Sequence, residues 1–117
     1  MKEVRFCQVS SHVYVRVSGR VGGSNTGFIL CEEGVVVVDT APTPAESRGD
    51  LEALRRVTDR PILALVLTHH HSDHAFGTQG FDCEVIASAE TDREMRLLGQ
   101  GYVEETRRHH AHLGEDL

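Results

Sequence analysis

The sequence lacks the long apolar stretches that a membrane protein needs. Its longest uninterrupted apolar runs are Val35–Val38 and Ile62–Leu67, whereas a helix that crosses a bilayer needs about 20 consecutive apolar residues. The N-terminal segment Met1–Cys7 also lacks the apolar core and the small-residue cleavage pattern of a secretory signal. We therefore predict neither a membrane span nor a signal peptide.

Clusters of basic residues are scarce as well. The chain has 12 Lys and Arg against 18 Asp and Glu, a formal net charge of −6, and its only adjacent basic pairs are Arg55-Arg56 and Arg107-Arg108. Proteins that bind nucleic acid contact its phosphates with clustered Lys and Arg. We therefore expect no nucleic-acid partner.

Cysteine is sparse and widely spaced. The three cysteines are Cys7, Cys31 and Cys83, and no two of them form a C-x-x-C pair. An odd set with this spacing is typical of a reduced protein whose thiols are small, buried apolar groups. The expected location is the cytoplasm.

What the sequence does contain is a series of short β-forming runs within one domain at most, since typical domains have roughly 100–150 residues. The run Val35–Val38 is β-branched and too short for a typical helix, which predicts a buried strand. The glycine-rich segment 19–27 is predicted to be a loop. Strands are predicted over residues 6–9, 12–17, 28–31, 35–40, 61–68 and 84–87.

A helix is predicted to begin after Thr43. Thr43 is a good N-cap, Pro44 suits the first turn, and Glu46 completes a capping box three residues after the cap. The helix is expected to end before Asp59-Arg60-Pro61. Its residues that three-residue spacing turns toward the core are Leu51, Leu54 and Val57.

Two further helical segments are predicted near the C-terminus. Thr91 and Glu94 form a second capping box, and a polar helical segment follows over residues 102–113. The predicted order is several strands, a helix, a strand, the His-rich loop, a strand and a helix. This order predicts a layered α/β (α+β) fold in which one helix joins two buried strands.

The segment Thr68–Gly77 carries the predicted chemistry. It follows directly on an apolar strand, where ligands gather in layered α/β proteins. His69 and His71 are two residues apart, so in an extended segment both side chains point the same way and can bind one metal ion. Asp73 and His74 follow after a bend and can face a second ion. Such a concentration of polar groups at a strand end predicts a metal site.

Four further histidines of the sequence have less specific patterns. His70 is expected to point away from its neighbours, where it either supports a ligand or is solvated. The histidines His109, His110 and His112 are interpreted as a solvated helix face.

His69-x-His71-x-Asp73-His74 resembles the H-x-H-x-D-H signature of the metallo-β-lactamase superfamily. The segments Ser24–Ile29, Gly34–Thr40 and His74–Gly77 resemble the same family, so that the likeness extends from about residue 10 to residue 98. The resemblance implies that residues 1–117 are a partial domain, the N-terminal half of an αβ/βα sandwich. The second half of the family's fold would supply the remaining ligands, and we expect the natural protein to continue past Leu117.

The resemblance also implies a role for each site residue. His69 and His71 would bind the first zinc ion, and Asp73 and His74 the second. Asp73 would also receive a proton from the attacking water. Asp39 would orient the metal loop through hydrogen bonds, although the residues alone also fit a plain strand-end aspartate that caps a turn.

The implied function is that of a dinuclear zinc hydrolase. A metal-bound hydroxide would attack an ester, thioester, lactam or related bond of a small-molecule substrate. Iron or manganese accept overlapping ligands, so that a mononuclear-iron sulfur dioxygenase on the same fold remains an alternative. A third reading is an inactive metal-binding fragment. One half of the sandwich would leave an apolar sheet face uncovered, which predicts self-association.

Overall fold

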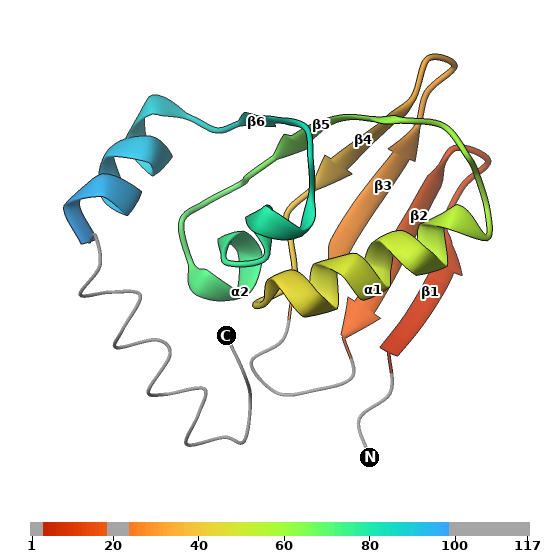
Figure 1. Cartoon of the computed structure of the whole chain (residues 1–117), viewed down its shortest axis with the longest axis horizontal. Coiled ribbons are helices and arrows are strands. Elements are labelled where there is room, and N and C mark those ends of the chain that lie inside the picture. Colours follow the sequence, from red (N-terminus) through yellow and green to blue (C-terminus); the bar gives the residue numbers. More distant parts are fainter. Residues whose placement is uncertain (1–3, 19–23, 99–117) are drawn as a thin grey trace.

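The computed structural model describes residues 4–18 and 24–98, which form a six-stranded mixed sheet with helices packed on one face (Figure 1). The strand order is β1-β2-β3-β4-β5-β6. Neighbours are antiparallel from β1 to β4 and parallel from β4 to β6. The strands are β1 Val4–Gln8, β2 Val13–Ser18, β3 Thr26–Leu30, β4 Val35–Val38, β5 Ile62–Val66 and β6 Glu84–Ile86.

The helices are α1 Pro44–Arg55, the short α2 Ser72–Ala75, a 3-10 turn η1 Thr78–Gly80 and a helical segment over residues 89–98. The predicted α/β class is therefore confirmed. No helix among the described residues has the length and apolar character to cross a bilayer. The predicted helical segment 102–113, with His109, His110 and His112, lies outside the described residues.

The core lies between α1 and the sheet. Val35 and Val37 are fully buried whereas Val36 and Val38 are half-buried, because successive side chains of a strand point to opposite faces. The prediction of a buried valine strand therefore holds for only one of its two faces. The largest core residues are Phe28, Val35, Val37, Leu54, Leu65, Leu67 and Phe81.

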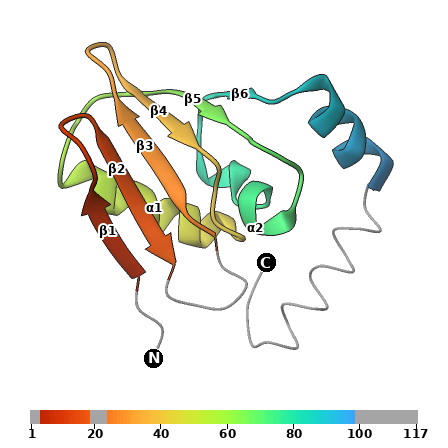
Figure 2. The ribbon, with the colours of Figure 1, turned by 180° about the vertical axis from the view of Figure 1, so that it is seen from behind.

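The opposite face of the sheet is apolar too. Pairing places Ile29 beside Val36, and Val38 beside Val66, on this second face. Figure 2 shows this face turned toward the viewer, with α1 behind the sheet. Self-association through this second sheet face stays a prediction.

Helix α1 begins as its sequence predicts. Thr43 has extended backbone angles, its hydroxyl accepts the Glu46 amide at 3.1 Å, and Pro44 occupies the first turn. Leu54 is fully buried, but Val57 is 39% exposed, so its predicted core position is wrong. The helix ends at Arg55, and three-residue spacing no longer fixes the direction of a side chain beyond that end.

The strands begin or end a few residues away from their predicted bounds, and two such differences change the role of a residue. Thr26 and Gly27, assigned to the glycine-rich loop, belong to β3 because they pair with Arg16 and Val15 of β2. The Thr91 amide donates to the Ser88 hydroxyl at 3.0 Å, so Ser88 has the capping position that was predicted for Thr91. Both residue types cap helices well, and the structure selects the earlier one.

Candidate metal centre

The site forms where two neighbouring parallel strands end. Val38 of β4 is paired with Val66 of β5, and the Asp39 amide extends the pairing by donating to the Val66 carbonyl at 2.8 Å. Parallel strands have their carboxyl ends at the same edge of a sheet, so the residues that follow β4 and β5 meet there. Asp39 thereby lies against Thr68 although 29 residues separate them in sequence.

Asp39 accepts hydrogen bonds from both sides of the loop that follows β5. Its Oδ1 accepts the Thr68 amide at 2.8 Å, and its Oδ2 accepts the Thr68 hydroxyl at 2.7 Å. The same Oδ2 lies 2.8 Å from Nδ1 of His74. The Asp39 side chain is 8% exposed, and its hydrogen bonds hold both Thr68 and His74 in place.

The hydrogen bonds assign the tautomers of two imidazoles. The hydroxyl of Thr68 has one proton, which it donates to Asp39, so it accepts the proton of His69 Nδ1 at 2.8 Å. A carboxylate is an acceptor only, so His74 likewise donates from Nδ1. In this assignment, which follows from the network rather than from visible hydrogens, Nε2 of each ring carries the lone pair that a metal ion binds.

Among the predicted ligands, the ring of His69 lies close to the rings of both His71 and His74. The ring centroids of His69 and His74 are 4.2 Å apart, and those of His69 and His71 are 4.7 Å apart. Ligand atoms of Asp39, His69 and His74 all lie within 4.8 Å of one another. His71 is exposed beside His69 and is not part of that closest group. Imidazole nitrogens and a carboxylate are suitable zinc ligands, so this donor set fits a metal ion.

Asp73 lies within α2, one residue before His74. Its predicted roles as metal ligand and proton acceptor, like the individual ligand roles of the histidines, remain predictions.

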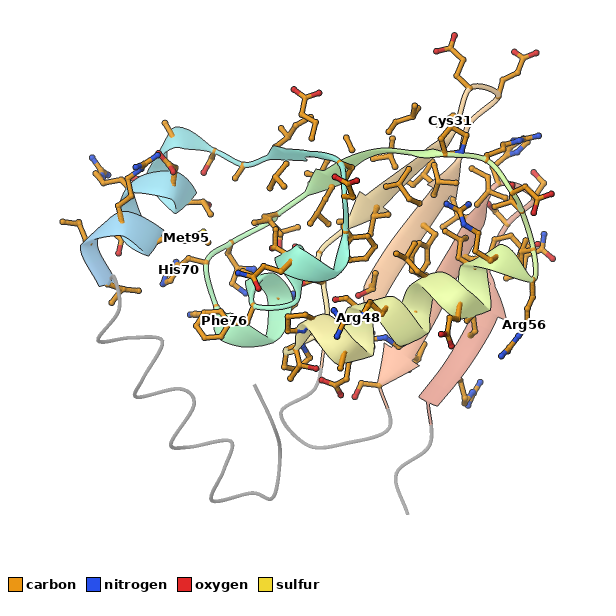
Figure 3. The ribbon with its side chains drawn as sticks, in the orientation of Figure 1. Cys31, Arg48, Arg56, His70, Phe76 and Met95 are labelled. Atoms are coloured by element: carbon orange, nitrogen blue, oxygen red, sulfur yellow. The ribbon has the colours of Figure 1, made fainter. Side chains whose placement is uncertain are left out.

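His70 is half-buried, and its ring contacts that of His71 at a centroid distance of 5.0 Å. In the view of Figure 3 it lies on the loop between β5 and α2, on the side toward the helix of residues 89–98. The sequence predicted that His70 points away from its neighbours, but its ring contacts that of His71.

A model of the metallo-β-lactamase superfamily matches residues 19–110. This chain belongs to the metallo-β-lactamase superfamily. A linear primary-alkylsulfatase from Pseudomonas sp. (strain ATCC 19151) is 42% identical over 57 residues, which are 49% of this chain and 11% of that protein. A crystal structure of a metallo-β-lactamase from Hirschia baltica superposes with a TM-score of 0.68 at 25% identity.

The match to the Hirschia baltica structure covers 77% of this chain and 45% of the other. The chain thus spans less than half the length of the relatives that it matches. The family consists largely of hydrolases, and the described part of this superfamily member contains a group of residues suited to a metal ion.

Sequence reasoning missed two threonines of this metallo-β-lactamase-like site. Thr68 was counted only as the end of a strand, yet its hydroxyl joins Asp39 to His69. Thr40 was also counted as a strand residue, yet it is fully buried against the main chain of His74. The available signal was the position of each threonine, directly beside a predicted site residue at a strand end.

A buried polar network lies behind the site. Arg16 donates to Asp50 at 3.0 Å, to Thr26 at 3.0 Å and to the Ser24 carbonyl. The Ser24 hydroxyl in turn donates to the Thr40 carbonyl at 3.2 Å. Burial raises the pKa of Asp50 to about 6, although the neighbouring Arg16 lowers it in part.

Proposed function

We propose that this chain carries the first metal-binding half of a dinuclear zinc hydrolase. The observation that supports this most is the Asp39–Thr68 arrangement, which orients His69 and His74 so that each presents Nε2. Membership of the metallo-β-lactamase superfamily supports the same function.

In this proposal different side chains of the loop bind the two metal ions. His69 and His71 hold one zinc ion, and Asp73 and His74 hold the other. When bound, the metal ions lower the pKa of a water to about 7 and polarise the bond under attack. Asp73 accepts a proton from the attacking water. Asp39 keeps the proton on Nδ1 of His74, which holds that ring in its metal-binding tautomer.

The substrate class that we propose is a small molecule with an ester, thioester, lactam or sulfate ester bond. The sulfate ester is included because one relative is a linear primary-alkylsulfatase. A pocket beside α2 supports an apolar substituent. Two of its lining residues, Leu67 and Ala75, directly neighbour Thr68 and His74 in sequence, and Phe76, Val85 and Met95 line it as well.

The first experiment measures metal content and hydrolysis on the same samples. The natural protein that contains this chain is loaded with Zn²⁺, dialysed and analysed for zinc, iron and manganese, then assayed with an aryl ester, a thioester, a chromogenic β-lactam and linear alkyl sulfates. His69→Ala is expected to lose zinc and hydrolysis together. The matched control His12→Ala changes an exposed histidine between β1 and β2 and is expected to keep both.

The outcomes separate the alternatives. Bound iron with sulfur oxidation would favour the mononuclear-iron dioxygenase, and tight metal binding without any hydrolysis would favour the metal-binding fragment. Among alkyl sulfates, KM is expected to fall about fourfold per added methylene if the chain enters the apolar pocket, since each buried methylene contributes about 0.8 kcal/mol. A KM independent of chain length would contradict that use of the pocket.

We also propose that the protein works in the cytoplasm. The three cysteines, Cys7, Cys31 and Cys83, are all free thiols and half-buried, which supports a reducing compartment.

A further inference from the structure

Thr40 forms hydrogen bonds to both ends of one short stretch of chain, from His74 to Gly77. Its amide donates to the His74 carbonyl at 2.9 Å. Its hydroxyl lies 3.0 Å from the same carbonyl and 2.9 Å from the Ala41 carbonyl, and it accepts the Gly77 amide at 3.1 Å. The residue is 0% exposed, so water cannot replace these hydrogen bonds.

The backbone of Asp39 explains how two consecutive residues reach the same histidine. In an extended strand, neighbouring side chains point to opposite faces. Asp39 has φ of 62°, in the left-handed region, which interrupts the strand geometry after β4. Asp39 can therefore contact the His74 ring while Thr40 contacts the His74 main chain.

Close packing holds the far end of the same stretch. A Cβ added at Gly77 would come within 2.5 Å of the Ala41 carbonyl and 2.9 Å of the Thr43 carbonyl, and it would collide with the Ser47 hydroxyl. The segment from His74 to Gly77 is thus seated directly against the turn that follows β4, and Thr40 is the side chain that bonds to both of its ends.

We propose that Thr40 is a positioning residue for the metal site, and that its hydroxyl fixes the main chain of His74 while Asp39 fixes the ring. This inference rests on the proposed metal site. Because a metal ligand tolerates only small displacements, loss of the hydroxyl weakens metal binding by His74 although Thr40 touches no metal.

The test compares Thr40→Val, which removes the hydroxyl at similar volume, with Thr40→Ser, which retains it. Metal-free protein is titrated with Zn²⁺ against a chromophoric chelator, and the Co²⁺-substituted protein is followed by its visible d–d absorption. Thr40→Val is expected to weaken the His74-dependent ion about 10–100-fold and to alter its Co²⁺ spectrum. Thr40→Ser is expected to restore the wild-type affinity and spectrum.

A matched control is Thr26→Val, which removes another fully buried hydroxyl, one that contacts Arg16 rather than α2. It is expected to lower thermal stability without changing the Co²⁺ spectrum. If Thr40→Val does not fold, Thr40→Ala against Thr40→Ser isolates the same hydroxyl.

Several results would overturn the inference. Wild-type metal affinity in Thr40→Val would do so, even with a lower melting temperature, because the residue would then be merely structural. Equal loss in Thr40→Ser and Thr40→Val would assign the effect to the packing of the whole side chain, because Thr40→Ser retains the hydroxyl. His74→Ala serves as the reference: if it leaves metal binding unchanged, the proposed site itself fails, whereas a loss there with normal binding in Thr40→Val rejects only the role of Thr40.

Discussion

The replacement Asp39→Asn tests the orientation of the two imidazoles directly. Asparagine tolerates the left-handed backbone about as well as aspartate does, so the φ of 62° adds little strain to the comparison. One side-chain oxygen is retained and can still accept the Thr68 amide. The NH₂ group that replaces Oδ2 faces two donors, the Thr68 hydroxyl and Nδ1–H of His74.

The conflict between these donors has a defined solution. His74 can accept from the new NH₂ group only by moving its proton from Nδ1 to Nε2, and Thr68 can turn its proton toward Nδ1 of His69 with the same result. Each change places a proton on the nitrogen that should bind metal. We expect metal affinity to fall about 10–100-fold, which corresponds to about 1.4–2.7 kcal/mol.

The assay joins two measurements on the same variant. Competition with a chelator gives the Zn²⁺ affinity, and ¹⁵N chemical shifts of the histidine rings in the metal-free protein give the tautomers. Asp39→Asn should show Nε2-protonated rings at His69 and His74, where the wild-type protein shows Nδ1-protonated ones. Unchanged tautomers together with unchanged affinity would refute the reasoning. Weaker binding with unchanged tautomers would indicate instead that Asp39 is itself a metal ligand.

Three further predictions follow from other contacts. Gly77→Ala should lower the free energy of unfolding by about 1–3 kcal/mol in chemical denaturation, because its Cβ would overlap the Ala41 carbonyl; unchanged stability would mean that α2 is not seated there. Asp50 has its pKa raised from 3.8 to about 6, so the folded state binds the proton more tightly and this group's contribution to stability falls by about 2 kcal/mol as the pH rises from 4 to 7. Asp50→Asn should remove that part of the slope, whereas exposed Asp59→Asn should not. Val36→Glu, on the second sheet face, should shift the chain toward monomer in sedimentation equilibrium, and equal masses for both proteins would reject self-association through that face.

The fold could be predicted from sequence wherever a local pattern determined it. The runs around Val35–Val38 and Ile62–Val66 form strands β4 and β5, and Thr43 caps α1 as expected, because β-branched runs and capping boxes act over a few residues. The assignment of Thr26 to a loop was wrong because strand pairing depends on residues that are distant in the sequence. Thr26 joins a strand because Arg16 lies opposite it, and nothing within its own glycine-rich neighbourhood indicates that pairing.

The same distinction applies to the candidate site. The histidines stand together in the sequence, so their proximity could be predicted and their rings do cluster. The contact between Asp39 and Thr68 could not be derived from residue patterns, because it depends on the register that pairs Val38 with Val66. The family resemblance suggested an orienting role for Asp39 but did not indicate the hydroxyl through which it reaches His69.

The residues that orient the histidine loop are distant from it in the sequence, and this affects the entropy cost of binding a metal ion. A loop that carries several imidazoles can hold them in many arrangements, and ordering flexible side chains costs conformational entropy each time a metal binds. Here the groups that restrict the loop, Asp39 and Thr40, come from the end of β4, which is anchored by the fully buried Val35 and Val37. The loop side chains therefore lose their conformational entropy when the sheet folds rather than when the metal binds. A loop peptide of residues 68–77 alone would retain every histidine of the cluster, yet it should bind Zn²⁺ more weakly than the full chain, because it lacks the strand that orients them.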